Sequence, residues 1–214
     1  MAKVDKKEIR RQEIVAAAQA VAARDGAEGA TLRAIAAEAG MAANAVLYYF
    51  GSHAEIIAAA VQASSGRFLE KLAESVDPGM SPTARLAAVI SAGTTAGLDD
   101  DVSRILYEYW PHMLRDAGQR RIQEELTKAQ ERVYRDIIDA GTSAGEFTPL
   151  LDPAKIARTL VAQEDGLVMD VLAGSASSEY VLDLMGNLAA ALLGLKAENL
   201  LELIVARGVS APAR

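Results

Sequence analysis

The stretch TLRAIAAEAGMAANAVLYYFGS, residues 31–52, decides how this sequence folds. Its apolar residues recur at helical spacing, and Gly40 interrupts that pattern once. Thr31 stands just before the first run, where its hydroxyl can accept a hydrogen bond from the free amides of a first helical turn. We therefore expect a short helix over residues 32–39, a tight turn, and a second short helix over residues 42–48.

A longer helix is expected ahead of this pair, over about residues 5–24. It should end at Gly26, because glycine adopts the left-handed conformation that closes many helices. Two short helices joined by a glycine-containing turn form a helix-turn-helix, whose second helix fits the major groove of DNA. Small alanines let the two helices cross closely, and the apolar contacts at their corner should come from Ile35, Met41 and Val46.

The second of these short helices carries side chains suited to DNA. Asn44 can pair with adenine through two hydrogen bonds, and the methyl group of Ala43 can touch a thymine methyl. Tyr48 and Tyr49 place hydroxyls at the ends of rigid rings, within reach of phosphate oxygens. The alternative is that both tyrosines close a helical core, as we expect Phe50 to do. Further backbone contacts are expected from Thr31, Arg33 and the basic residues of segment 6–11.

The rest of the chain has a helical pattern and lacks strand and hairpin signals, so we expect an all-α protein of about nine helices. Pro82 and Pro153 fit first helical positions, where a missing amide costs nothing. We expect a helix-turn-helix DNA-binding domain over residues 1–51 and a larger helical bundle for effector binding and dimerisation over residues 52–214. Besides Thr31, the residues placed to cap helices are Ser52, Ser81, Asp152 and Ser178.

Two features of the expected bundle concern its packing. The last expected helix begins near Ser178 and is apolar almost all round as far as Leu195, so it must be covered on two sides. The second cover is either another copy of the chain or other helices of the same subunit. We expect a homodimer through the last two helices, the earlier of which has a face of small residues: Thr159, Ala162, Gly166 and Ala173. In the run over residues 119–140, a single buried stripe is expected: Ile122, Leu126, Ala129, Val133 and Ile137.

The N-terminal segment resembles the DNA-binding domain of the TetR family of transcriptional regulators. The resemblance covers about residues 10–60 and is carried by GATLRAIAAEAG, by the helix that ends in YYFGS, and by the long helix that follows. It implies an all-helical homodimer whose variable C-terminal domain binds a small effector. More distantly, YEYWPHML, SAGEF and EDGLVMDVLAG resemble the C-terminal domain of the branch that includes the betaine-operon repressor.

Four positions depart from the family pattern. Ala42 replaces the usual serine at the start of the recognition helix, and Asn44 replaces a glycine. Leu47 replaces a tyrosine that commonly contacts phosphate. His53 stands where lysine is usual, and we keep it as a candidate DNA contact. Each change removes or alters a contact, so the operator cannot be inferred from relatives.

A carboxylate lies in the middle of an apolar face over residues 152–173. Glu164 falls at the centre of this arc and Asp165 at its edge. Unpaired burial of a carboxylate costs several kcal/mol or forces its protonation. Glu164 therefore either pairs with an arginine of a neighbouring helix, such as Arg132 or Arg135, or faces a cationic effector. The expected effector site is Tyr107, Trp110, Tyr134, Glu164 and Asp165, with Tyr109 and His112 near the aromatic residues.

Composition narrows the function further. The chain has no cysteine and two histidines, and it lacks phosphate-loop and nucleophile-elbow motifs, so we expect no enzymatic activity, metal or cofactor. The net charge is −7, yet the first eleven residues hold five basic and two acidic side chains, so that edge can still meet a polyanion. We find no secretory signal pattern and no membrane-spanning run, and we expect a cytoplasmic protein.

These observations predict a ligand-responsive transcriptional regulator, a repressor that a small-molecule effector releases from a palindromic DNA operator. A cation is one candidate for the effector. The alternative is an all-helical dimeric ligand-binding or scaffold protein with weakened DNA binding, and Ala42 and Leu47 favour it. The operator, the effector and the regulated genes cannot be read from the residues.

Overall fold

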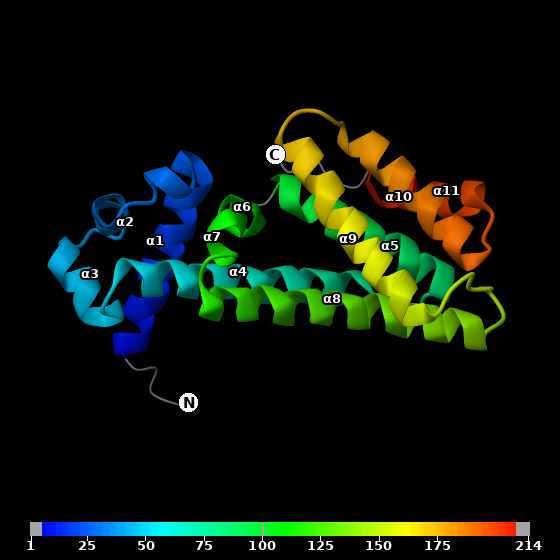
Figure 1. The fold of residues 1–214 in the computed structure, drawn as a ribbon, viewed down its shortest axis with the longest axis horizontal. Coiled ribbons are helices and arrows are strands. Elements are labelled where there is room, and N and C mark those ends of the chain that lie inside the picture. The colour runs from blue at the N-terminus through cyan, green and yellow to red at the C-terminus, as the bar shows by residue number, and fades with distance from the viewer. Residues whose placement is uncertain (1–5, 100, 209–214) are drawn as a thin grey trace. The chain divides into compact units, whose positions relative to one another are not determined.

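The computed structural model describes the backbone of residues 6–99 and 101–208, and the side chains of residues 6–94 and 104–207. Figure 1 shows this part of the chain as helices joined by loops and turns. There are eleven helices in the described residues, against the nine expected. They are α1 (Lys6–Gly29), α2 (Leu32–Glu38), α3 (Ala43–Phe50), α4 (His53–Ser75), α5 (Pro82–Asp99), α6 (Asp101–Glu108), α7 (Trp110–Met113), α8 (Ala117–Ser143), α9 (Pro153–Leu172), α10 (Ser178–Leu193) and α11 (Ala197–Gly208).

The described residues form two compact units. The first comprises residues 6–68 and 101–123, and the second comprises residues 69–99 and 124–208. The division of function at residue 51 remains a prediction. None of the helices in the described ranges is both long and apolar enough to cross a membrane.

The first unit contains the expected helix-turn-helix. Val46 and Phe50 of α3 are buried, as is Ile35 of α2, and they pack with the apolar face of α1. Gly40 has a φ of 63°, which permits the tight turn between α2 and α3. Met41 is only half buried, so it contributes less to the corner than expected.

The first helix runs further than its sequence suggested. It continues to Gly29, with a break at Gly26, where φ is 73° and ψ is 179°. The positive φ matches the expected conformation, but the chain resumes a helical turn after it. The hydroxyl of Tyr109 donates a hydrogen bond to the carbonyl of Ala27 at 3.3 Å, and α6 packs against α1. The extra turn is therefore held by residues far away in the sequence.

Four of the five expected caps are present. Thr31, Ser52 and Ser81 each accept a hydrogen bond from the amide three residues later, at 3.2 Å in each case. Asp152 accepts from the amide of Ala154 at 3.0 Å. The fifth cap was assigned one residue too late, because Ser177 accepts from the amide of Tyr180 and Ser178 begins α10.

The second unit is built around α5, which packs with α9, α10 and α11. In Figure 1, α9 and α10 are joined by the loop that follows Gly174. The sequence had placed one helix through Leu195, but Gly194 adopts the left-handed conformation at φ 68° and ends α10. Thr148 and Leu150 donate backbone hydrogen bonds to the last carbonyls of α10, at 2.8 Å each. The helix α11 follows and was missed.

The buried face of α8 also differs from the expected stripe. Leu126 and Ile137 are buried as expected, but Ile122, Ala129 and Val133 are only half buried. The buried face is rotated so that Tyr134 lies on it, and the hydroxyl of Tyr134 contacts Glu164 of α9. It comprises Leu126, Gln130, Tyr134, Ile137, Ile138 and Gly141.

The segment SAGEF ends α8 and ties it to α5. Gly145 adopts a φ of 74°, and the amides of Glu146 and Phe147 return to the carbonyl of Gly141. The ring of Phe147 fills the space where Gly141 would carry a Cβ. The carboxylate of Glu146 then accepts hydrogen bonds from the amide of Thr83 at 3.1 Å and from its hydroxyl at 2.7 Å. This carboxylate caps the first turn of α5.

Candidate functional site

The outer face of α3 is polar and accessible. Asn44 is exposed, and Tyr48 keeps 77 % of its surface exposed. Ala43 and Tyr49 are half exposed on the same short helix. The rings of Tyr48 and Tyr49 meet edge to face, with centroids 5.4 Å apart. The structure therefore brings four of the expected DNA contacts onto one helix and keeps both tyrosines out of the core.

An arginine of α1 holds the end of α3 in place. The guanidinium of Arg11 donates a hydrogen bond to the carbonyl of Tyr49 and lies 4.0 Å from the centroid of the Phe50 ring. Because Phe50 is itself buried, this contact fixes α3 from both its backbone and its inner face. Sequence reasoning had grouped Arg11 with the phosphate-binding segment and missed this role, since nothing local links residue 11 to residue 50.

A hollow of about 640 Å³ lies between the start of α1 and the end of α3. Basic side chains outnumber acidic ones around it, and both tyrosines border it. Its lining is Lys6, Lys7, Ile9, Arg10, Glu13, Tyr48 and Tyr49. A basic hollow bordered by hydroxyls suits an anion such as a backbone phosphate.

The three remaining DNA candidates differ in availability. Arg33 is exposed on α2, and the exposed Thr31 uses its hydroxyl oxygen to cap that helix. Nε2 of His53 lies 2.7 Å from the carbonyl oxygen of Ala30, which requires this nitrogen to donate. One ring nitrogen of His53 is thus engaged inside the protein, which leaves Nδ1 for any contact with DNA.

The second unit contains a buried carboxyl group. Glu164 of α9 is 1 % exposed, and its Oε2 accepts a hydrogen bond of 2.6 Å from the hydroxyl of Tyr134 on α8. The Gln130 side chain donates to the same carboxylate. Desolvation raises the pKa of Glu164 to about 8, and the nearby Asp165 adds to this, while the hydrogen bonds from Tyr134 and Gln130 oppose it. At neutral pH this carboxyl group is therefore mostly protonated.

The carboxyl group of Glu164 also fills a gap in α5. A Cβ added to Gly93 would lie 2.3 Å from Oε1 of Glu164, which no real Cβ tolerates. Glycine at this position is thus what allows the carboxyl group to reach the backbone of α5. Burial and the negative charge of Glu164 raise the pKa of the Tyr134 hydroxyl well above its usual value, so this hydroxyl remains a donor.

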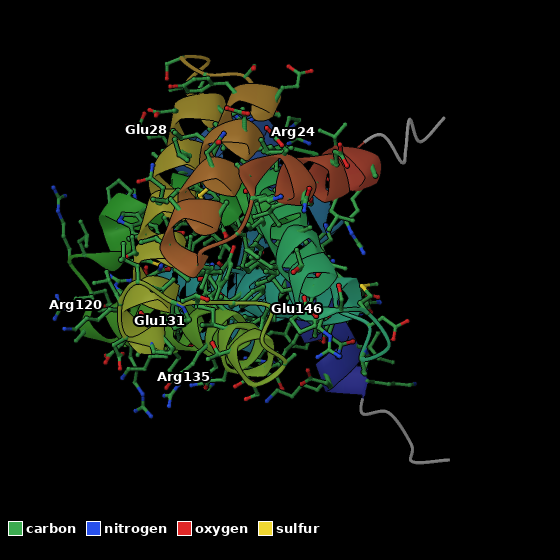
Figure 2. All side chains as sticks on the ribbon, turned by 90° about the vertical axis from the view of Figure 1, so that its right-hand side faces the viewer. Arg24, Glu28, Arg120, Glu131, Arg135 and Glu146 are labelled. Carbon is green, nitrogen blue, oxygen red and sulfur yellow. The ribbon has the colours of Figure 1, made fainter. Side chains whose placement is uncertain are left out.

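The two arginines suggested as partners of Glu164 are not its partners. Arg132 is exposed. Arg135 projects outward from α8 (Figure 2), and its Nε lies 3.6 Å from Oδ2 of Asp139. Both point away from the buried face because α8 is rotated relative to the expected stripe. Asp165 is half buried, and burial raises its pKa to about 6 against the opposing charge of Arg158.

Near Gly93 and Glu164, two buried polar atoms of described residues lack a hydrogen-bond partner. They are Oγ1 of Thr94, on the residue after Gly93, and Oε1 of Gln130, on the side chain that faces Glu164. Sequence reasoning missed Gly93, Thr94 and Gln130. A polar side chain on the inner face of α8 was the available signal for Gln130, and no local pattern marks the other two.

The aromatic candidates fall into two groups. Tyr107 and Trp110 belong to the first unit, and their rings are nearly parallel, with centroids 6.5 Å apart and an angle of 8° between the planes. Tyr134, Glu164 and Asp165 belong to the second unit. Tyr109 is buried, and burial raises the pKa of its hydroxyl to about 12. The structure brings Tyr134 to Glu164, and Tyr107 to Trp110.

No group of three or more metal-binding side chains occurs among the described residues. The expectation that the protein uses no metal or cofactor remains a prediction.

Comparison with known protein families matches two parts of the chain. A family model for bacterial regulatory proteins of the tetR family matches residues 14–60. A second model, for a tetracyclin repressor-like C-terminal domain, matches residues 91–178. Together they cover more than half of the chain. The chain belongs to the TetR family of transcriptional regulators. It is accordingly a DNA-binding regulator of transcription and not an enzyme.

Named relatives of this TetR-family protein are also regulators. The uncharacterized HTH-type transcriptional regulator YfiR of Bacillus subtilis is 26 % identical over 168 residues, covering 78 % of this chain and 82 % of that one. The HTH-type transcriptional repressor KstR2 of Mycolicibacterium smegmatis is 24 % identical over 143 residues, covering 67 % of this chain and 70 % of that one. A regulator from Saccharomonospora viridis, solved in complex with choline, superposes with a TM-score of 0.77 at 21 % identity over 84 % of this chain and 95 % of that one. This last likeness shows the shared fold.

Proposed function

We propose that this TetR-family protein is a homodimeric repressor that binds a palindromic operator and leaves it when a small cationic effector binds. The observation that supports DNA binding most strongly is the outer face of α3, where Asn44 and Tyr48 are exposed while Val46 and Phe50 anchor the helix. A helix held on one side and polar on the other can enter a major groove without rearrangement.

Each exposed group has a role in this proposal. Asn44 reads adenine, and Ala43 contacts a thymine methyl. Tyr48 and Tyr49 bind phosphate oxygens beside the basic hollow at the start of α1. Arg33 and Thr31 add backbone contacts from α2. His53 contributes through Nδ1, since its other nitrogen faces Ala30.

The dimer is proposed to form through α9 and α10. The expected small-residue face of α9 is exposed in the single subunit, and a Cβ added to Gly166 would meet no atom within 4 Å. Two large apolar side chains are exposed near it in the sequence, Met169 at 47 % and Tyr180 at 59 %. Small residues that admit a close helix and apolar side chains that need cover both favour a second copy on this surface.

Glu164 is the centre of the proposed effector site. Among the described side chains, no lysine or arginine pairs with it, and it is nearly fully buried. Burying a carboxyl group without a cationic partner costs stability. Groups of this kind are found most often at functional sites. A cationic ligand would supply the missing charge. Asp165 adds a second acidic group beside it, whereas the Tyr107 and Trp110 rings remain candidates for a separate aromatic contact.

One observation favours the alternative of a helical ligand-binding or scaffold protein. Ala42 is the N-terminal cap of α3 and makes no side-chain hydrogen bond. The serine that is common in the family at this position could accept one from the first turn of the helix. Leu47 removes a further phosphate contact. Both changes weaken DNA binding without altering the fold.

Fluorescence anisotropy with DNA from the promoter region of the protein's own gene separates the two functions. A repressor binds with an affinity that falls steeply as salt rises, because phosphate contacts release counterions. Asn44→Ala should weaken binding about tenfold on that DNA, as expected for a lost bidentate contact. Binding that is absent at low salt, or equal for all DNA sequences and unaffected by Asn44→Ala, would favour the scaffold.

A further inference from the structure

Among the described residues, the buried cluster around Glu164 offers more hydrogen-bond acceptors than donors once its carboxyl group is ionised, as pairing with a cation requires. The ionised carboxylate offers two acceptor oxygens, and Oε1 of Gln130 accepts without being able to donate. The donors in place are the hydroxyl of Tyr134 and the amide of Gln130, and both already face the carboxylate. Acceptors left unpaired in a buried site cost free energy, so a ligand that brings donors completes the cluster.

From this accounting we infer that the effector is a cation that carries N–H groups, such as a primary amine, rather than a quaternary ammonium compound. The inference rests on the proposed effector site at Glu164 and narrows its ligand class. An ammonium group supplies both a positive charge to the carboxylate and an N–H donor to the unpaired Oε1 of Gln130. A quaternary ammonium supplies the charge alone and is normally held against the faces of aromatic rings.

The ring geometry around Glu164 points the same way. Tyr134 approaches the carboxyl group with its hydroxyl, at 2.6 Å, and so does not offer its ring face there. Both oxygens of the carboxyl group also lie against Gly93 of α5, which carries no side chain. Neither contact offers the charge an aromatic ring face, which a cage for a methylated cation would need.

Ligand binding at this site exchanges the proton of Glu164 for a cationic amine. Without a ligand, Glu164 is kept neutral by its own proton, and the bound amine replaces that proton as the source of positive charge. Among the described side chains, the titratable groups that face Glu164 are Tyr134 from α8 and Asp165 from α9, and Gly93 of α5 contributes none. The carboxyl group of Glu164 also fills the space beside Gly93. An amine that draws this carboxyl group away would weaken the contact between α9 and α5.

Matched ligand pairs test the inference on the full-length protein. Isothermal titration and thermal unfolding are measured with ethanolamine against choline, and with benzylamine against benzyltrimethylammonium. We expect at least one amine to bind at least tenfold more tightly than its trimethylated partner, and Glu164→Gln to abolish that binding. Glu124→Gln, at an exposed carboxylate of α8 that pairs with Lys128, serves as the control and should leave binding unchanged.

A second variant separates hydrogen bonding from charge. Gln130→Leu keeps Glu164 but removes the unpaired acceptor together with the amide that donates to the carboxylate. An amine then loses an acceptor that its trimethylated partner never used, so the preference for the amine should shrink at least threefold. If the quaternary compounds bind as tightly as the amines or more tightly, the N–H inference is wrong while the proposed cationic site stands. If no compound of either pair binds the folded protein, both the inference and the proposed site are wrong.

Discussion

The hydroxyl of Tyr134 donates a 2.6 Å hydrogen bond to Glu164, and both side chains are almost completely buried. This bond joins α8 to α9 through two groups that each prefer to be protonated in the protein interior. This hydrogen bond allows a carboxyl group to be buried at the centre of an apolar helix face without an arginine as its partner. Because burial raises the pKa of Glu164, the stability of the second unit should also depend on pH.

Glu164→Gln should remove a pH dependence of stability. The pKa of Glu164 is about 8 in the folded protein and about 4.5 when unfolded, so the folded state holds the proton more tightly. Its contribution to stability is complete below pH 4.5 and is lost as pH rises to about 8, by at most about 1.4 kcal/mol per pH unit. Urea unfolding should show the wild-type protein losing free energy of unfolding relative to Glu164→Gln between pH 5 and 8.

The pKa of Asp165 is also raised, to about 6, but this residue is present in both proteins, so its contribution largely cancels in the comparison. The difference between the two proteins should level off above pH 8. A difference that is constant from pH 5 to 8 would mean that Glu164 is ionised throughout.

Amine binding should strengthen as pH rises toward 8. The ligand needs the ionised form of Glu164, and below pH 8 a proton must leave before the amine can pair with it. The dissociation constant for the tighter amine should fall by up to about tenfold per pH unit between pH 6 and 8. Titrations in buffers of different ionisation enthalpy should register the released proton. Affinity that is independent of pH would contradict the exchange of proton for ligand.

Gly93→Ala should destabilise the protein because its methyl group would clash with the carboxyl group of Glu164. We expect a loss of about 1–3 kcal/mol in urea unfolding, the usual cost of overpacking. In a Glu164→Ala background the same change should be neutral or stabilising. Gly66→Ala is the matched control, since its Cβ would meet no atom within 4 Å, and it should stabilise α4 by about 0.5–1 kcal/mol. Equal losses in both backgrounds would exclude the clash as the cause.

Arg11→Met should weaken DNA binding through the position of α3. It removes the hydrogen bond to Tyr49 and the cation over the Phe50 ring, and we expect about 1–2 kcal/mol of lost stability. The affinity for operator DNA should fall while the salt dependence stays nearly constant. Arg10→Met, at an exposed residue of the basic hollow, should have the opposite profile, with little effect on stability and a salt slope reduced by about 1. Identical salt slopes for both variants would contradict these separate roles.

Glu146→Ala should loosen the start of α5. Its carboxylate accepts from both the amide and the hydroxyl of Thr83, so its loss leaves that amide without its acceptor while Ser81 still caps Ala84, at a cost of about 1–2 kcal/mol. Thr83→Val removes the hydroxyl alone and should cost less. A double-mutant cycle should find the two changes coupled, and additive effects would show that the cap contributes little.

The helix-turn-helix could be predicted from the sequence because its determinants are local. Thr31 caps α2, Gly40 permits the turn, and the spacing of Ile35, Val46 and Phe50 defines one buried side. The exposure of Tyr48 followed from its place on the opposite side of α3. These signals lie within twenty residues of one another, so no knowledge of distant contacts was needed.

The features that were missed depend on distant contacts. The break at Gly194 is fixed by hydrogen bonds from residues 148–150, and the extra turn after Gly26 is held by Tyr109. The burial of Glu164 was predicted correctly, but its partner was not. An arginine on α8 was the natural electrostatic choice, and the rotation of that helix presents Tyr134 and Gln130 instead.

Hydroxyl-radical footprinting of the full-length protein on its operator tests most directly the claim that a symmetric dimer places two copies of α3 in successive major grooves. We predict two equal protected segments on one face of the duplex, related by a two-fold axis and centred about 10–10.5 base pairs apart, with both lost together in Asn44→Ala. A single protected segment, or protection that is unchanged in Asn44→Ala, would contradict the account.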